Sequence, residues 1–305
     1  VSSLDPHSAF LTPDLYKDMK IDTQGKFGGL GIEITIPKED ETLTIVSPIE
    51  DTPAYKAGLQ PNDKILEIDG VTTKGMNLIE AVKKMRGKED TKVTITVYRK
   101  GWTKPKKFTL VRANIKIKSV KYLDMDKGYG YIRVTNFQEQ TYTDLKNVLD
   151  TLEKKNKGTM TGLILDMRNN PGGLLDQAIK ISDEFLEKGI IVSTRGRGEK
   201  NQAIEYAKKE GTRTNYPIIV LINGASASAS EIVAGALQDN GRALIAGSQS
   251  FGKGSVQTVI ELNDQSGLKL TIAKYYTPNG TSIQAKGITP DITIDNIDPK
   301  VLEKT

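Results

Sequence analysis

The sequence predicts an α/β fold in two parts, a larger core with a largely parallel sheet and a smaller mixed α+β module. Three observations lead to this prediction. The chain has 305 residues, which is too long for one small core, and its apolar content suffices for two. Short apolar runs alternate with helical stretches from residue 114 onward, a pattern typical of parallel sheets. Residues 27–112 instead carry a compact series of short strands and helices.

Spacing of apolar residues predicts the elements of the smaller module. Residues 1–26 precede it as a polar lead-in with too little apolar periodicity for a domain. Apolar residues three and four apart predict a helix over 78–85. A short helix over 54–59 is closed by glycine. Alternating apolar residues predict strands at 43–46, 64–70, where the strand leads into a turn, and 92–98.

The core, residues 113–305, follows a strand, helix, strand, helix order. Five short apolar runs of strand length are separated by helical stretches, which favours parallel pairing through crossover connections. The predicted strands are 129–134, 162–167, 190–193, 217–222 and 243–246, and the clearest predicted helices are 142–154 and 174–186.

Composition excludes several classes of partner and of catalytic chemistry. The 43 lysines and arginines exceed the 38 acidic residues by only five and form no dense basic block, so we expect no nucleic acid partner. No apolar run reaches the ~18 residues that cross a bilayer. Because the first residue is Val1, we expect a mature or trimmed form that has lost any export signal, lipid anchor or N-terminal helical region. With no cysteine, disulfides and thiol catalysis are excluded, and no cofactor or metal is expected.

Three serines alternate where a predicted strand gives way to a predicted helix. Ser226, Ser228 and Ser230 follow strand 217–222, and the helix begins near Ser228. A serine on such a turn projects its hydroxyl from the sheet edge, and the N–H of Ala229 points the same way at the positive end of the helix. This geometry suits a nucleophile with an oxyanion donor. The alternative is that these serines only cap the helix.

A serine nucleophile needs a base, and the chain has a single histidine, His7. Lysine is the remaining candidate, and Lys253 lies between Gly252 and Gly254. Its pKa is ordinarily near 10.4, so only a desolvated amine accepts a proton at neutral pH, and lowering the pKa by about three units costs about 4 kcal/mol. Gln257 lies four residues on, where its carboxamide can hold the amine. The alternative is a lysine in a solvated loop.

A third motif follows strand 162–167. The run from Asp166 to Leu174 ends in Pro-Gly-Gly and opens a helix, so backbone N–H groups are available there for an oxyanion. Gly172 and Gly173 are the expected donors. We interpret Asp166 and Arg168 as an ion pair that orients the loop.

A glycine-rich run opens the smaller module. Gly28, Gly29, Leu30, Gly31 and Ile32 place flexible backbone before a strand, where successive N–H groups can converge on a carboxylate and the strand edge can accept a peptide. Thr52-Pro53-Ala54, Ala57-Gly58-Leu59 and the series from Pro61 to Gly70 accompany it. Together these motifs resemble a PDZ domain, which binds free C-termini. The alternative is a glycine-rich hairpin without a ligand.

The motifs of the core then resemble the carboxyl-terminal processing (tail-specific) proteases, in family order and over nearly the whole chain. The resemblance implies Ser228 as nucleophile, Lys253 as general base and Gln257 as the residue that orients it. It also implies a ClpP/crotonase-like spiral core with the PDZ domain inserted. It is carried by residues 166–173, 226–232, 235–239 and 251–257, and by Asp5-Pro6-His7-Ser8 before the PDZ domain.

The same resemblance implies partners and location. We expect protein substrates with accessible C-termini, a homo-oligomer, a possible adaptor protein, and a bacterial periplasm or cell envelope location. Arg86, at the end of helix 78–85, resembles the basic residue that couples substrate sensing to the catalytic loop.

Two other functions compete with a protease. Gly247 to Lys253 resembles a phosphate-binding loop, but Gly254 replaces the Ser or Thr that binds Mg²⁺, and a predicted strand over 256–262 replaces the required helix. The other alternative is a non-catalytic scaffold, or an inactive relative, that only holds C-termini.

Overall fold

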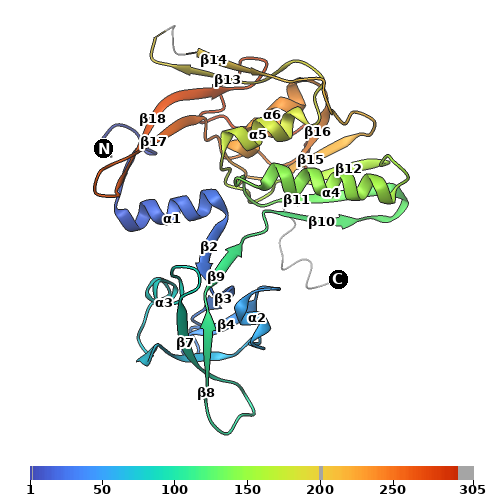
Figure 1. Cartoon of the computed structure of the whole chain (residues 1–305). Helices are drawn as coiled ribbons and strands as arrows, with labels where there is room; N and C mark the ends of the chain where they lie inside the picture. Colours follow the sequence, from blue (N-terminus) through green and yellow to red (C-terminus); the bar gives the residue numbers. More distant parts are fainter. Residues whose placement is uncertain (2, 199–201, 295–305) are drawn as a thin grey trace. The chain divides into compact units, whose positions relative to one another are not determined.

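A computed structural model describes residues 1, 3–198 and 202–294 (Figure 1). The chain divides into two compact units. Unit 1 combines Val1–Gly25 with the chain from Lys118 onward, and unit 2 is Lys26–Ile117. The fold is therefore a mixed α/β one with several sheets, and each unit has its own hydrophobic core.

The central sheet of unit 1 has six strands in the order β10-β11-β12-β15-β16-β19. All pairings from β11 to β19 are parallel, and β10 is an antiparallel edge. The strands that we predicted over 129–134, 162–167, 217–222 and 243–246 all lie here. Their bounds are β10 Val120–Asp124, β11 Tyr129–Val134, β12 Gly162–Asp166, β15 Ile218–Ile222, β16 Ala243–Gly247 and β19 Ile292–Thr293.

Helices connect these strands and bury apolar faces on the sheet. Helix α4 (Thr141–Lys155) packs on β10 and β11 through Leu145, Leu149 and Leu152, which are fully buried. Helix α5 (Leu175–Asp183) lies between α4 and α6 (Ala229–Asp239), and α6 contacts β16. The 3-10 turn η1 (Asp126–Gly128) joins β10 to β11. None of the described helices is long and apolar enough to cross a membrane.

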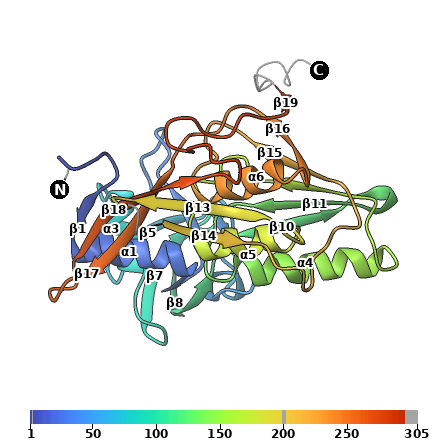
Figure 2. The ribbon, with the colours of Figure 1, turned by 90° about the horizontal axis from the view of Figure 1, so that it is seen from above.

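A second, antiparallel sheet of unit 1 was not predicted from the sequence. Its order is β1-β18-β13-β14, with β17 on the other side of β18, as Figure 2 shows from above. Two of its strands were predicted singly, at 190–193 and 256–262, and the first belongs to this sheet rather than to the parallel one. The bounds are β1 Ala9–Leu11, β13 Ile190–Gly196, β14 Gln202–Tyr206, β17 Ser255–Glu261 and β18 Gly267–Tyr276.

The N-terminal residues differ from the polar lead-in that we predicted. They form β1, which pairs with β18, and helix α1 (Pro13–Gln24). The helix starts at Thr12, whose hydroxyl accepts from the N–H of Leu15, and it ends at Gly25 with φ +68°. Residues 1–25 therefore belong to unit 1, because strand pairing and capping order them without a periodic apolar pattern.

Unit 2 holds a sheet in the order β3-β4-β5-β7-β8, with β6 beside β5, and a two-stranded pair β2-β9. Helix α3 (Leu78–Met85) and strand β7 (Lys92–Tyr98) confirm the predicted elements over 78–85 and 92–98. The other bounds are β2 Lys26–Gly29, β3 Ile32–Thr35, β4 Thr44–Pro48, α2 Pro53–Lys56, β5 Lys64–Ile68, β6 Val71–Thr72, β8 Lys106–Val111 and β9 Ala113–Lys116.

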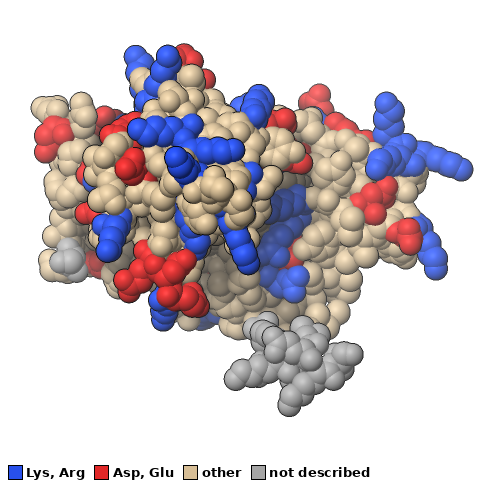
Figure 3. Space-filling view, turned by 90° about the horizontal axis from the view of Figure 1, so that it is seen from below, with Lys and Arg blue, Asp and Glu red and all other residues tan. Residues whose placement is uncertain are grey.

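The surface in Figure 3 carries lysine and arginine side chains interspersed with aspartate and glutamate. Mixed charge of this kind is typical of a solvated protein surface.

Candidate active site

The three serines near the start of α6 have different environments. The Ser226 hydroxyl donates to the carbonyl of Met167 at 2.8 Å, and the Ser230 hydroxyl donates to the carbonyl of Asn170 at 3.0 Å, and both side chains are fully buried. Ser228 is half-buried, and its hydroxyl has no acceptor within the described part of the chain. Among these three serines, Ser228 is thus the one whose hydroxyl donates no hydrogen bond to the described residues.

The backbone of Ser228 is strained. Its φ is +55° and its ψ is −112°, a region that costs a non-glycine residue about 1–3 kcal/mol. Gly172 packs directly against it, since a β carbon added at Gly172 would lie 2.8 Å from the β carbon of Ser228. This strained strand-to-helix turn presents the hydroxyl beside the Pro-Gly-Gly turn, as a nucleophile requires.

A buried carboxylate, Glu231, joins Ser228 to Lys253. Its Oε2 accepts from the N–H of Ser228 at 2.7 Å and from the N–H of Lys253 at 2.9 Å. Its Oε1 accepts from the N–H of Gly252 and the hydroxyl of Ser250, each at 2.6 Å. Because Oε2 accepts from both groups, the backbone nitrogens of Ser228 and Lys253 lie no farther apart than the sum of these two N···O distances. Glu231 was not among the predicted site residues, although a glutamate three residues after a serine at a helix start is a capping signal.

The loop that carries Lys253 is packed rather than solvated. Gly254 is buried against the segment that follows β18, and a β carbon there would lie 2.3 Å from the backbone nitrogen of Gln284. The Lys253 side chain is half-buried. Burial, followed by the charge of Lys269, lowers the pKa of the Lys253 amine, and Glu231 opposes the shift. The solvated-loop alternative is therefore wrong.

Gln257 lies on β17, four residues beyond Lys253. Its Nε2 donates to the backbone carbonyl of His7 at 2.7 Å, so the carboxamide oxygen is the end left to accept another hydrogen bond. The lysine amine has no hydrogen-bonding partner among the described residues, and the Gln257–Lys253 hydrogen bond that we expected is not formed.

Two of the three expected oxyanion donors are available. The N–H of Gly172 donates to Oδ1 of Asn170 at 2.9 Å and is thus occupied inside the turn. Within residues 3–198 and 202–294, no acceptor binds the N–H of Gly173 or that of Ala229, the first residue of α6. A β carbon at Gly172 would lie 3.0 Å from the nitrogen of Ala229, so the turn and the helix start are in contact.

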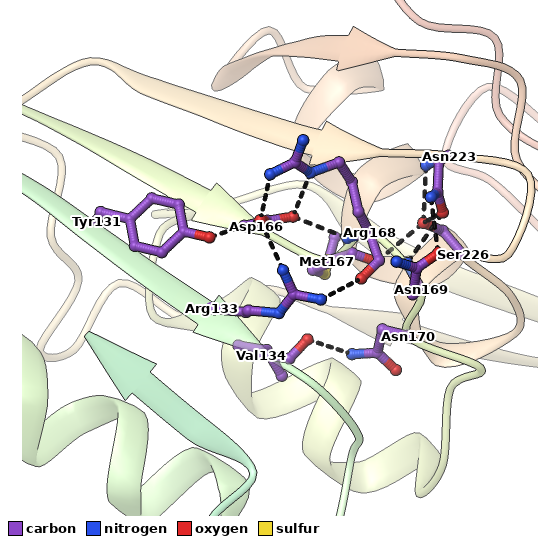
Figure 4. A network of polar contacts seen from close by, with 10 residues as sticks. All are labelled: Tyr131, Arg133, Val134, Asp166, Met167, Arg168, Asn169, Asn170, Asn223 and Ser226. Atoms are coloured by element: carbon purple, nitrogen blue, oxygen red, sulfur yellow. Dashed lines mark hydrogen bonds and ion pairs between the residues drawn. The ribbon is translucent and has the colours of Figure 1, made fainter. Parts of the chain in front are cut away.

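The loop after β12 is held by the network in Figure 4. Arg168 binds Asp166 through Nε at 3.0 Å and through a terminal nitrogen at 2.8 Å, which confirms the predicted ion pair. Arg133 and the hydroxyl of Tyr131 also bind this fully buried carboxylate. Burial favours the neutral acid, but the hydrogen bonds from Arg168 and Tyr131 outweigh it and hold the pKa of Asp166 below its ordinary value.

Asparagines connect this loop to the serine turn. Asn169 and Asn223 bind each other through side chain and backbone at 2.8 and 2.9 Å. Asn170 is fully buried, donates to the carbonyl of Val134 and accepts through its own carbonyl from the N–H of Ala227. These contacts fix the two loops relative to each other. These contacts were not predicted, because asparagines near a turn usually indicate only the turn.

Unit 2 has a groove between β3 and α3. Of the predicted peptide-binding residues, Gly29, Leu30, Gly31 and Ile32 line it. Gly28 does not, because its carbonyl accepts from the N–H of a neighbouring glycine, residue 87, and its α carbon packs against that backbone. The remaining lining residues are Phe27, Ile34, Val82, Met85 and Arg86.

Arg86 lies at the end of α3, with its guanidinium 4.6 Å from the ring centre of Phe27. The described residues include no cluster of three or more histidine, cysteine, aspartate or glutamate side chains suited to a metal ion.

Known proteins match both units. The model of peptidase family S41 matches residues 128–294, and a PDZ domain model matches residues 44–99. A carboxy-terminal-processing protease of Bartonella bacilliformis is 52% identical over 295 residues, which covers 96% of this chain and 67% of that protein. A carboxyl-terminal-processing protease of Synechocystis sp. is 40% identical, over 95% of this chain and 68% of that protein.

Among solved structures, a photosystem II D1 C-terminal processing protease is 31% identical with a TM-score of 0.57, over 95% of this chain and 78% of that one. The chain belongs to peptidase family S41 and is a serine-type peptidase with a PDZ domain, similar to the carboxy-terminal-processing proteases.

Proposed function

We propose that this protein is an endopeptidase that recognises protein C-termini through its PDZ groove and cleaves with Ser228 as nucleophile and Lys253 as general base. The observation that carries the proposal is the single Glu231 oxygen that binds the backbone N–H groups of both residues. It holds the uncommitted hydroxyl and the desolvated amine on adjoining backbone segments.

The reaction begins with proton transfer. The neutral amine of Lys253 takes the proton of the Ser228 hydroxyl as the oxygen attacks a peptide carbonyl, and a tetrahedral oxyanion forms. The N–H groups of Gly173 and Ala229 donate to that oxyanion. This role is supported because neither N–H group has an acceptor among the described residues.

The lysine ammonium then protonates the leaving amine as the C–N bond breaks, which leaves an acyl ester on Ser228. The same amine then deprotonates water, which attacks the ester, and the ammonium returns the proton to the Ser228 oxygen as the ester bond breaks. Gln257 orients the amine through its carboxamide oxygen, because its nitrogen is held by the His7 carbonyl.

The groove of unit 2 fits a free C-terminus. The backbone N–H groups of Leu30 and Gly31 are buried and, among the described residues, have no acceptor. Buried donors of this kind favour binding of a carboxylate, and the apolar side chains of Ile34, Val82 and Met85 favour an apolar last residue. We propose that Arg86 couples occupancy of this groove to catalysis. If Arg86→Ala cleaved protein tails as fast as the wild type, that role would be wrong.

The family resemblance adds four further proposals. These are a ClpP/crotonase-like spiral for the core, a homo-oligomer, an adaptor protein, and a bacterial periplasm or cell envelope location. The parallel pairing of β11, β12, β15 and β16 supports the first.

The test is cleavage of an unstructured protein with an apolar C-terminus, followed by mass spectrometry of the products. We expect Ser228→Ala and Lys253→Ala to abolish cleavage while peptide binding is retained. Lys286→Ala, an exposed lysine on the segment packed against the catalytic loop, is the matched control and should remain active. Amidation of the substrate C-terminus should weaken binding because it removes the carboxylate. Binding without cleavage by the wild type would instead indicate a scaffold.

A further inference from the structure

The segment Asp5–Ser8, here called the N-terminal turn, is hydrogen-bonded to Thr271 on β18. Oδ1 of Asp5 accepts from the N–H groups of His7 and Ser8 at 2.8 and 3.0 Å and from the hydroxyl of Thr271 at 2.9 Å. Its Oδ2 accepts from the hydroxyl of Ser8, which in turn accepts from the N–H of Thr271 at 3.0 Å. One carboxylate therefore organises the whole turn and fixes it to the strand.

The turn lies where Gln257 needs a partner. In the antiparallel pair β17-β18, Gln257 is directly opposite Thr271, so the two side chains share one face of the sheet. The turn that binds Thr271 thus reaches that face, and the carbonyl of His7 accepts from Nε2 of Gln257 at 2.7 Å. This contact is made by a backbone atom, which is why the residue types of the turn do not reveal it.

The His7 carbonyl selects one of two orientations of the carboxamide. A carbonyl oxygen only accepts, so it pairs with the NH₂ end of Gln257 and not with the oxygen. The carboxamide oxygen is then directed away from the turn. A rotation of 180° would exchange the two ends and present a donor where an acceptor is needed.

A lysine that acts as a base needs such an acceptor. The neutral amine has two N–H groups and one lone pair, so an acceptor on an N–H group helps to direct the lone pair toward the serine hydroxyl. After proton transfer the ammonium has three donors and is stabilised by the same acceptor. A misplaced carboxamide would lower the rate of chemistry without changing how substrate binds.

We propose that the N-terminal turn is part of the catalytic machinery, with Asp5 as a positioning residue that acts through the His7 carbonyl on Gln257 and so on Lys253. This inference rests on the proposed function of Lys253 and Gln257. It makes residues that precede unit 2 in the sequence necessary for chemistry in the core that follows it.

The experiment compares kcat and KM for Asp5→Ala and Asp5→Asn with the same unstructured substrate. Alanine removes all four hydrogen bonds, and we expect kcat to fall about 10-fold or more with KM within about 2-fold, since small displacements of a catalytic group have effects of this size. Asparagine retains Oδ1, which accepts three of the four, and should restore most of the activity.

The matched control is Asp264→Ala. Asp264 accepts from the N–H and the hydroxyl of Ser266 in a similar turn, at the other end of the β17-β18 hairpin. This variant loses the same kind of turn without contacting Gln257, so its kcat should equal that of the wild type.

A double-mutant cycle separates positioning from a general loss of structure. If Asp5 acts through Gln257, the double variant Asp5→Ala/Gln257→Ala should be no slower than Gln257→Ala alone. Additive losses, or a kcat for Asp5→Ala equal to that of the wild type, would overturn the inference. Should Asp5→Ala fail to fold by circular dichroism, Thr271→Val removes one of the bonds in the same sheet and should give a smaller loss of kcat with the same non-additivity. If Lys253→Ala or Gln257→Ala were themselves fully active, the proposed function would fail instead.

Discussion

Replacing Glu231 by glutamine tests whether one buried carboxylate holds the catalytic loops together. Glu231 is fully buried and accepts four hydrogen bonds, two on each oxygen. A carboxamide has nearly the same shape but only one accepting end. In either orientation its NH₂ group faces two donors, and at least one backbone N–H group is then left unpaired.

The magnitude follows from those bonds. In the better orientation the carboxamide oxygen keeps the N–H groups of Ser228 and Lys253, and the hydroxyl of Ser250 turns to accept. The N–H of Gly252 then has no acceptor, which costs about 1–3 kcal/mol, and each retained bond changes from a charged to a neutral type at a loss of about 1 kcal/mol. We expect Glu231→Gln to lower the free energy of unfolding by about 3–5 kcal/mol and to reduce cleavage strongly.

Urea unfolding followed by circular dichroism measures this change at pH 7. The control is Glu205→Gln, an exposed glutamate on the edge strand β14, which should shift the free energy of unfolding by no more than about 0.5 kcal/mol. If Glu231→Gln lowered the free energy of unfolding by no more than the control does, Glu231 would not hold these segments together.

Three further changes have defined outcomes. Gly172→Ala should abolish cleavage with substrate binding retained, because φ is +104° and the added methyl group would lie 2.8 Å from the β carbon of Ser228, the proposed nucleophile. The pH–rate profile should rise with a limb below the ordinary lysine pKa, since the proposed mechanism requires neutral Lys253 and activity would be lost as pH falls through its lowered pKa. Lys269→Gln should move that limb to higher pH by removing a like charge, and a shift to lower pH would contradict the assignment. Asp63→Asn should lower the free energy of unfolding of unit 2 by about 3 kcal/mol in a denaturation experiment, because buried Asp63 loses its charge pairing with Arg99.

Local patterns predicted the elements whose apolar residues face one core. Helix α3 and strand β7 have the predicted bounds, and four parallel strands of unit 1 were found as short apolar runs. The antiparallel sheet of unit 1 escaped prediction for a physical reason. The strands at 190–193 and 256–262 were predicted singly, but β14 is exposed along its length and β1 has only three residues, so neither of these shows the continuous apolar run of a buried strand.

In the candidate active site, the sequence indicated residue types but not the contacts that those residues make. The single histidine directed attention to Lys253 and Gln257, whereas the choice of Ser228 among three alternating serines came from the family resemblance. The contacts of Glu231 and of the His7 carbonyl could not be predicted, since they depend on which backbone N–H and C=O groups approach from segments distant in sequence. Gly28 was selected with the groove for its residue type, but it packs against the end of α3.

A base and a buried carboxylate can coexist here because the carboxylate is already satisfied. Glu231 lies close enough to raise the pKa of Lys253, which would favour the inactive ammonium. Its oxygens, however, each accept two hydrogen bonds from backbone and hydroxyl donors and none from the amine, so Glu231 and Lys253 form no ion pair that would hold the ammonium. Burial of Lys253 and the charge of Lys269 then decide the direction of the pKa shift. The same carboxylate therefore fixes the backbones of the proposed nucleophile and base without holding the amine as an ammonium in an ion pair.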